Sequence, residues 1–282
     1  MNNSDYDWPK ISVVTPSFNQ GEFIEQTICS VLEQGYPNLE YIIIDGGSTD
    51  CSVEIIKKYE HLLAYWVSEK DNGQYHAINK GFSVSTGEVM LWINSDDLLI
   101  KGSLEAIGSI FRQFRGVVKW ITGVPAYADK NGNVFKIFNN FRYHRNLIRF
   151  GCYEGRAINW IMQECTAWTR DLWNSIGAKL DDNLNFAADF KLWCDFSQHA
   201  HLYWVSTVLG CNRQHAGQKT EITDQYYCEV DHIVRENAMT YLFNRFFRIN
   251  IVKKLAKTYF LTTKNKKYLS YEFKSCQWRL ED

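Results

Sequence analysis

The first 115 residues alternate between short apolar segments and amphipathic ones, and this order restricts the fold more than any other feature of the chain. Apolar segments rich in β-branched residues lie at 11–18, 39–47, 63–71 and 88–97. The segments between them carry apolar residues at helical spacing. Near-continuous apolar strands separated by helices are typical of a parallel sheet that is covered on both faces. The sequence therefore predicts an α/β fold with a mostly parallel central sheet flanked by helices.

Three of the predicted strands end in polar residues, namely TPSFNQ, DGGSTD and NSDD. Right-handed crossovers bring the carboxyl ends of parallel strands to one edge of a sheet, and ligands bind along that edge in open α/β sheets. A single polar strand end can simply turn outward to meet water, but three clusters on one edge favour a shared site. Asp45, Asp96 and Asp97 are its candidate members.

Asp96 and Asp97 are neighbouring like charges, and their repulsion costs free energy unless a positive group offsets it. Mg²⁺ or Mn²⁺ is commonly held by one or two carboxylates, with phosphate oxygens completing the shell. We therefore expect a divalent cation that neutralises a diphosphate leaving group. The sequence contains no G-x-x-x-x-G-K-[ST] loop, and no G-x-G-x-x-G follows the first strand. A P-loop NTPase is thus excluded and a dinucleotide site is disfavoured.

The second half of the chain is less regular. Residues 117–138 predict a hairpin with its turn at DKNGN, and residues 186–200 predict a helix that is followed by the strand HLYWVSTVL. From about Thr223 onward the pattern is helical and increasingly basic. The second half therefore combines strands with helices and ends in helices.

We divide the chain into two parts. Residues 1–220 form one domain, with a nucleotide-binding part at about 10–115 and an acceptor part at about 116–220. Residues 221–282 form a helical, basic C-terminal extension. The charge supports the division, because residues 1–220 hold 20 Lys and Arg against 24 Asp and Glu, whereas the extension holds 11 against 8.

Composition excludes several other classes of protein. A net charge of −1 gives no electrostatic reason to expect nucleic acid. The eight cysteines are scattered without a C-x-x-C pair, so we expect reduced thiols in a cytoplasmic protein rather than a zinc ribbon. The N-terminal MNNSDYDWPK does not resemble a signal peptide. No apolar run reaches the roughly 18 residues of a membrane-spanning helix.

Several motifs in a fixed order carry a resemblance to a known family. TPSFNQGEFIEQTICSVLEQGYPNLEYIIIDGGSTD is followed by EKDNGQYHAINKG and then by TGEVMLWINSDD. Over residues 10–220 the chain resembles family 2 glycosyltransferases of the GT-A fold, of the kind that build bacterial surface polysaccharides such as lipopolysaccharide. The resemblance implies an inverting enzyme that uses a nucleotide-diphosphate sugar, with UDP as the expected nucleotide and Mn²⁺ or Mg²⁺ as cofactor. The transferred group would be a hexosyl or N-acetylhexosaminyl unit.

The resemblance also implies roles for particular residues at the strand ends. The donor site would be formed by Pro16 and Phe18 beside the base, Asp45 at the uracil edge, Asp71 at the nucleoside, Asp96 at the ribose or sugar, and Asp97 at the metal. Ser95 stands where many members have an acid, which leaves the motif with one fewer carboxylate. His215, in NRQHAGQKT, would complete the metal shell or contact the diphosphate, although it can equally be a loop histidine without a ligand.

Inverting transfer needs a general base that deprotonates the acceptor hydroxyl. By resemblance this base is Asp189 in FAADFKLW, preceded by Ala188 rather than by a glutamate. An acid at this place can also serve only the helix dipole, and Asp181, Asp182 and Asp195 are weaker candidates for the base.

The resemblance further suggests that the segment IMQECTAW borders the acceptor and donor-sugar pocket. Gln163, Glu164 and Trp168 are its candidate residues, and Trp168 could stack on a sugar ring, although any one of the ten tryptophans is more often core.

Residues 241–274 contain nine Lys and Arg and one acid, interleaved with apolar residues. A basic amphipathic helix of this kind can lie on an anionic membrane surface, or it can pack its apolar side on the domain. Membrane contact would suit an enzyme with a glycan or lipid-linked glycan acceptor that works peripherally on the inner face of the plasma membrane.

Two other classes fit part of the pattern. A sugar-nucleotide nucleotidyltransferase would also use a metal and paired acids, but TPSFNQGEF lacks the basic residues expected in its first loop. A non-catalytic nucleotide-sugar-binding protein would keep the fold and lose the base.

Overall fold

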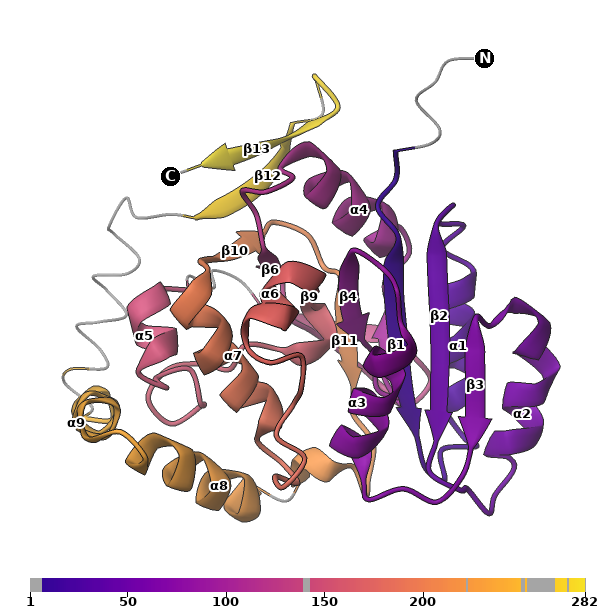
Figure 1. Ribbon diagram of the computed structural model, residues 1–282, viewed down its shortest axis with the longest axis horizontal. Coiled ribbons are helices and arrows are strands. Elements are labelled where there is room, and N and C mark those ends of the chain that lie inside the picture. The colour runs from indigo at the N-terminus through magenta and orange to yellow at the C-terminus, as the bar shows by residue number, and fades with distance from the viewer. Residues whose placement is uncertain are drawn as a thin grey trace.

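The computed structural model describes residues 7–138, 143–221, 223–249, 252, 267–272 and 274–281. Within these residues a nine-stranded sheet forms the centre of the molecule, with strand order β13-β12-β10-β6-β9-β4-β1-β2-β3 (Figure 1). Its strands are β1 (Ile11–Ser17), β2 (Leu39–Asp45), β3 (Tyr65–Ser68), β4 (Val89–Trp92), β6 (Trp120–Thr122), β9 (Thr166–Thr169), β10 (Leu202–Val205), β12 (Tyr268–Glu272) and β13 (Gln277–Glu281). β1 runs parallel to β2 and β4, and β2 runs parallel to β3. The predicted α/β fold with a mostly parallel sheet is confirmed.

Helices cover both faces of this sheet, as expected for apolar parallel strands. The helices of the first half are α1 (Ile24–Leu32), α2 (Ser52–Tyr59), the 3-10 turn η1 (Glu60–Leu62), α3 (Gln74–Val84) and α4 (Ser103–Gln113). Alternate residues of β1 point to opposite faces. Val13 packs with α1, α2 and α4, whereas Val14 packs with α3 and with elements of the second half. The sheet therefore separates two apolar cores.

A smaller sheet lies beside the first, with strand order β5-β11-β7-β8. It comprises β5 (Leu98–Leu99), β7 (Ala126–Ala128), β8 (Val134–Ile137) and β11 (Gly210–Arg213). β7 and β8 are antiparallel, and the Asp129 carboxylate between them accepts hydrogen bonds from the amides of Asn131 and Asn133, both at 2.9 Å. The hairpin predicted around DKNGN is confirmed. Because β5 follows Asp97 directly, this sheet anchors the acidic doublet.

The second core is built largely from aromatic side chains. It lies under α5 (Arg145–Arg149), the 3-10 turn η2 (Gln163–Cys165), α6 (Arg170–Ser175) and α7 (Ala188–His199). Trp168 is fully buried there, with its ring centroid 5.5 Å from that of Trp92 and 5.9 Å from that of Trp193. Trp168 therefore supports the sheet from inside and cannot stack on a sugar, so its predicted place in the acceptor pocket is wrong.

The C-terminal extension is helical only in its first part. The 3-10 turn η3 (Lys219–Glu221) leads into α8 (Thr223–Arg235) and α9 (Ala238–Phe247), as predicted from Thr223 onward. Residues 268–281 instead form the antiparallel pair β12 and β13, and β12 adds in parallel to β10. Leu269 and Trp278 bury their side chains in the first core, which explains why these strands join the sheet. Much of the basic segment 241–274 lies outside the described residues.

The structure forms no disulfide among the eight cysteines, all of which lie within its described residues. In the described part of the chain, no helix has both the length and the apolar character that crossing a membrane requires.

Candidate active site

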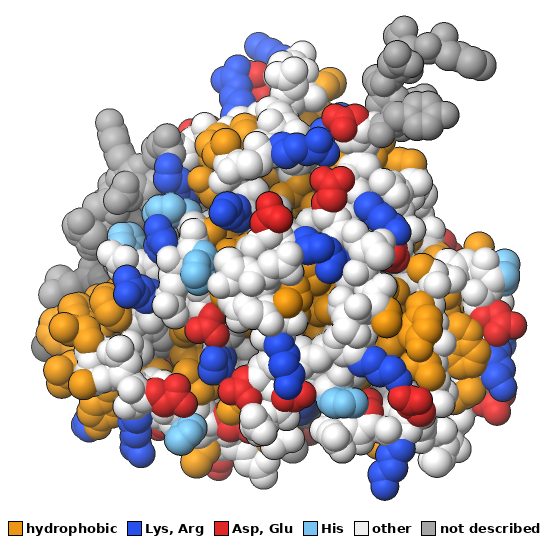
Figure 2. All heavy atoms as spheres, viewed as in Figure 1, with side chains coloured by type: hydrophobic (Ala, Val, Ile, Leu, Met, Phe, Trp, Pro, Cys, Tyr) orange, Lys and Arg blue, Asp and Glu red, His pale blue; other side chains and the backbone are white. Residues whose placement is uncertain are grey.

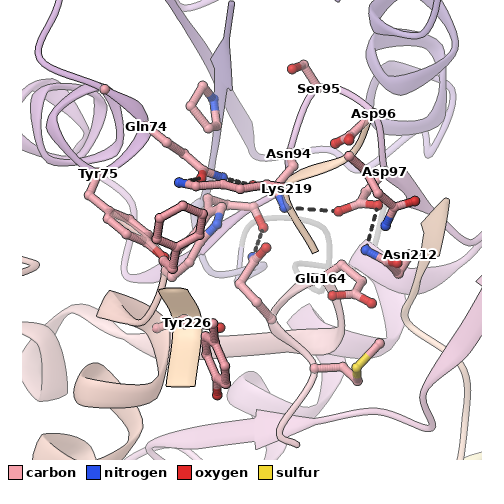
Figure 3. A pocket seen from close by; sticks show the side chains of 18 of the residues that line it. Gln74, Tyr75, Asn94, Ser95, Asp96, Asp97, Glu164, Asn212, Lys219 and Tyr226 are labelled. Atoms are coloured by element: carbon pink, nitrogen blue, oxygen red, sulfur yellow. Dashed lines mark hydrogen bonds between the residues drawn. The ribbon is translucent and has the colours of Figure 1, made fainter. Parts of the chain in front are cut away.

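A cleft of about 910 Å³ opens at the carboxyl ends of the parallel strands. One side is formed by the ends of β1 and β4 and by the loops after β2 and β3, and the other side by η2, α7, η3 and α8 (Figure 3). Of the residues that the sequence singled out, the cleft is bordered by Pro16, Phe18, Asp71, Asp96, Asp97, Gln163, Glu164 and Asp189. Three strand ends and a distant helix thus meet at one place, as the edge rule for parallel sheets requires.

Asp97 is the most constrained of the acids. It is 1 % exposed, and its Oδ1 accepts hydrogen bonds from the Arg213 amide at 2.9 Å and from the Asn212 side chain at 3.2 Å. Its Oδ2 accepts from the Asn94 side chain at 3.0 Å. Burial raises the pKa of Asp97 well above its ordinary range, and the nearby charges of Asp96 and Glu164 raise it further.

Glu164 reaches the same place through strand register. β4 and β9 are antiparallel, with Met90 opposite Trp168, so the residues just before β9 lie beside those just after β4. The Gln163 side chain accordingly donates to the Trp92 carbonyl at 2.6 Å. Glu164 is buried, and its Oε1 has no hydrogen-bond partner among the described residues. Burial raises its pKa to about 7.

Arg213 is a buried cation beside the doublet, but its guanidinium does not pair with either carboxylate. Its guanidinium is buried and donates to the Asp96 carbonyl, to the Gln26 side chain and to the Lys130 carbonyl, at 2.6–2.8 Å. Among the described ion pairs, none joins a lysine or arginine to Asp96 or Asp97. Arg213 therefore fixes the backbone of the doublet, while the carboxylates keep their need for positive charge.

These carboxylates fit a divalent cation. Three buried or half-buried acids converge, and one of their oxygens lacks a partner. The described residues contain no group of three or more His, Cys, Asp or Glu side chains that is already arranged to hold a metal. Mg²⁺ does not need such a group, because it is usually bound by one or two carboxylates together with water and substrate phosphates. The arrangement therefore suits a cation that arrives with a phosphate ligand.

Asp189 faces the cleft from the first turn of α7. Its Oδ1 accepts from the Phe190 amide at 2.8 Å, and burial raises its pKa to about 6. The charge of Lys219 opposes this rise. The three weaker candidates for the base, Asp181, Asp182 and Asp195, border a separate small hollow.

Lys219 is a site residue that sequence reasoning missed. Its ammonium donates to the Gln74 side chain at 2.9 Å and lies 5.0 Å from the ring centre of Tyr75 and 5.1 Å from that of Phe186 (Figure 3). Burial lowers its pKa, and the nearby Asp189 carboxylate opposes that effect. Lys219 lies in the short turn η3, where the residues show neither a hydrophobic periodicity nor a known motif. The sequence around it therefore does not indicate that it borders the site.

The nucleotide side of the cleft contains the exposed ring of Phe18, which is 59 % accessible. Asp71 packs directly against Gly46, where a Cβ atom would lie 2.9 Å from its carboxylate oxygen. Glycine at 46 therefore lets the acid approach. The Asp71 carboxylate also accepts from the Gly73 amide at 2.8 Å, which shapes the loop before α3.

Asp45 does not take the predicted position at the base edge. It is fully buried, and its two oxygens accept hydrogen bonds from the amides of Gly47 and Ser48 and from the hydroxyls of Ser48 and Ser68, at 2.5–3.1 Å. The predicted contact with uracil is therefore wrong. Asp45 instead holds the loop that follows β2.

His215 lies beside Asp96, with its Nε2 3.1 Å from Asp96 Oδ2 and its Nδ1 3.0 Å from the Ala216 carbonyl oxygen. Its ring packs on Phe23 at 4.3 Å between centroids. Since both ring nitrogens face oxygen atoms, this arrangement orients Asp96. A metal-ligand role for His215 stays a prediction.

The sheet, the flanking helices and the cleft at the strand ends define the GT-A fold, the architecture of nucleotide-diphospho-sugar transferases. Staphylococcus aureus TarS 1–349 in complex with UDP-GlcNAc is similar in structure, with a TM-score of 0.61 at 16% identity over 80% of this chain and 65% of that chain. The mannosyltransferase PcManGT of Pyrobaculum calidifontis in complex with GDP-Man and Mn²⁺ gives a TM-score of 0.59 at 17% identity over 89% and 74%.

The model of glycosyl transferase family 2 matches residues 12–154, about half of the sequence. The chain belongs to that family. An uncharacterised glycosyltransferase of Rickettsia typhi is 25% identical over 215 residues, which are 75% of this chain and 66% of the relative. The putative teichuronic acid biosynthesis glycosyltransferase TuaG of Bacillus subtilis is 37% identical over 100 residues, 34% and 40% of the two chains. The match thus spans just under two thirds of the first relative and two fifths of the second.

The raised pKa of Glu164 predicts a pH-dependent stability. Its pKa is about 7 in the folded protein against an ordinary value of 4.5. Between these two pH values the folded state therefore binds more protons than the unfolded state. Glu164 therefore destabilises the fold progressively as pH rises from about 4.5 to about 7. Without divalent cations, the unfolding free energy of Glu164→Gln minus that of wild type should increase by about 3 kcal/mol as pH rises from 4.5 to 8. Urea denaturation in EDTA measures this difference.

Glu33→Gln, at an exposed position after α1, controls for the substitution itself. Asp96, Asp97 and Glu164 together form the acidic cluster of the cleft. A difference in unfolding free energy between Glu164→Gln and wild type that stays constant across the pH range would contradict the placement of Glu164 in this cluster.

Proposed function

We propose that this protein is an inverting glycosyltransferase that moves a hexosyl or N-acetylhexosaminyl group from a UDP-sugar to a glycan or lipid-linked glycan. The observation that carries the proposal is one cleft that joins a buried, under-neutralised acidic cluster to a separate carboxylate, Asp189, with a raised pKa. Family membership and the nucleotide sugars named for TarS and PcManGT support the donor class. The name of TuaG supports a role in surface polysaccharide assembly.

Asp97 would hold Mn²⁺ or Mg²⁺, and Asp96 would contact the ribose or sugar of the donor. The bound cation would offset the charge that develops on the departing diphosphate. Phe18, Pro16 and Asp71 border the part of the cleft assigned to the nucleoside. Lys219 borders the same cleft, and its charge lowers the pKa of Asp189 against the effect of burial, which favours the ionised carboxylate. In this proposal the nucleotide part extends over about 10–115 and the acceptor part over about 116–220, with the division of the chain near 220.

Asp189 would act as the general base. With a pKa of about 6 it is largely ionised at neutral pH and still basic enough to accept a proton. It takes the proton of the acceptor hydroxyl while that oxygen bonds to the anomeric carbon. The bond from this carbon to the diphosphate oxygen breaks, and UDP leaves with the electron pair. Attack opposite to the leaving group inverts the anomeric centre.

Asp189→Asn tests the base directly. Transfer should fall by about 10²- to 10⁴-fold, the usual contribution of a general base, while affinity for the UDP-sugar stays within about twofold. A thermal-shift screen with Mn²⁺ identifies the donor, and UDP release with p-nitrophenyl glycosides as acceptors measures turnover. Calorimetry measures donor binding.

Asp195→Asn is the matched control, because Asp195 lies on the same helix but borders the separate hollow. Turnover that survives Asp189→Asn would contradict the assigned base. Donor binding without transfer by the wild type would instead support a non-catalytic nucleotide-sugar-binding protein. Release of diphosphate from a sugar phosphate and UTP would support a nucleotidyltransferase.

We also propose a peripheral location on the inner face of the plasma membrane. Met239, Leu242, Phe246 and Ile249 lie three or four residues apart on and just after α9, and their side chains are 52–64 % exposed. They form an apolar group at the lower left of the molecule (Figure 2). An exposed apolar helix face of this kind can insert at a lipid interface.

A vesicle sedimentation assay tests this location. The wild type should sediment with phosphatidylglycerol-containing vesicles, and the double variant Leu242→Glu, Phe246→Glu should remain in solution. Val134→Glu, Phe135→Glu on β8 is the control, because these side chains are also exposed and apolar. Equal sedimentation of both double variants would contradict the role of α9.

A further inference from the structure

The wall of the cleft that faces the strand ends is aromatic. It includes Tyr153, Trp160, Phe186, Tyr226 and Tyr227. Trp160 differs from the others because its side chain is 42 % exposed, whereas Tyr153 is 4 % exposed. A large aromatic ring left open inside a cleft offers a flat apolar surface to a ligand. Asp96, Asp97 and the exposed ring of Phe18 belong to the opposite side.

The loop beneath Trp160 is shaped to hold that ring. Gly155 adopts φ +93°, and a Cβ atom at this position would lie only 2.2 Å from the indole Cζ2. The amide of Gly155 donates to the Ile158 carbonyl at 2.8 Å, which closes the loop under the indole. The Trp160 indole thus packs directly on the backbone of Gly155, and any side chain at position 155 would prevent this contact.

A network of one buried and three half-buried charges joins this loop to the C-terminal helices. Glu154 is fully buried, and its carboxylate accepts from the Arg156 guanidinium and from the Ala157 amide, both at 2.8 Å. Arg156 and Arg248 both pair with Asp231 on α8, at 2.5 and 2.8 Å. Arg248 also lies 3.4 Å from Glu154.

Partly desolvated ion pairs add little net stability, because the cost of desolvation offsets their attraction, but several pairs that share partners require one geometry. This network therefore sets the position of the Trp160 loop relative to α8. Tyr227 belongs to the same arrangement, since its ring lies 4.2 Å from the Arg156 guanidinium. The extension thus completes one wall of the cleft.

We propose that Trp160 is the stacking platform for the acceptor saccharide, and that α8 completes this subsite with Tyr226 and Tyr227. This inference rests on the proposed function. A pyranose ring has an apolar face of C–H groups and a rim of hydroxyls, so it packs on an indole and leaves its hydroxyls free to bind polar groups. Asp189 borders the same cleft, so a sugar on Trp160 can direct one hydroxyl to the base. The nucleotide is held from the other side by the strand ends.

Trp160→Ala should raise the acceptor KM about tenfold, the loss expected for one aromatic contact, while kcat changes less than about threefold. Trp160→Phe should recover most of the loss, because it restores a ring. Phe135→Ala, at an exposed position outside the cleft, should leave the acceptor KM unchanged. Donor KM and the affinity for UDP with Mn²⁺ should be the same in all four proteins.

Saturation-transfer NMR with a panel of methyl pyranosides, added to the protein loaded with UDP and Mn²⁺, measures binding without turnover. The wild type should bind at least one glycoside, and Trp160→Ala should lose it. Glycoside binding by a wild type that shows no transfer would contradict the proposed function but support this subsite. An unchanged acceptor KM in Trp160→Ala, an increase in donor KM instead, or no glycoside binding by the wild type would overturn the inference.

Discussion

The site depends on one electrostatic constraint, the burial of several carboxylates at the edge of a parallel sheet. Asp97 and Glu164 are almost inaccessible to water, and like charges in such surroundings cannot all ionise without a positive partner. Arg213 is close enough to help, but its guanidinium is engaged with backbone carbonyls and Gln26. The fold therefore concentrates negative charge at the place where the proposed cation and diphosphate would supply its compensation.

The topology explains why these groups meet. The doublet follows β4, and the antiparallel neighbour β9 brings Glu164 to the same level. α7 and α8 then cover the opening, with Ala187 and Phe190 packed against Val230 and Val234. The segment after residue 220 therefore packs against the rest of the protein, since α8 borders the cleft and β12 extends the sheet.

Sequence reasoning succeeded where a general rule of parallel sheets applied. The strand-end rule brought Pro16, Phe18, Asp96 and Asp97 to one cleft because it depends only on chain direction. It failed for Asp45, because a carboxylate at a strand end can equally satisfy the amides of its own turn. The pattern also could not distinguish Trp168 from Trp160: both lie near η2, but only the pairing of β4 with β9 shows that Trp168 points into the core. Lys219 and the β12–β13 pair depend on long-range packing that leaves no local periodicity.

The most direct test of the cation claim is a crystal of the protein grown with UDP and MnCl₂, measured for anomalous scattering at the manganese edge. The account predicts one strong peak within about 2.5 Å of an Asp97 carboxylate oxygen and of a diphosphate oxygen. Well-ordered UDP in the cleft, with no manganese peak beside Asp96 or Asp97, would contradict it.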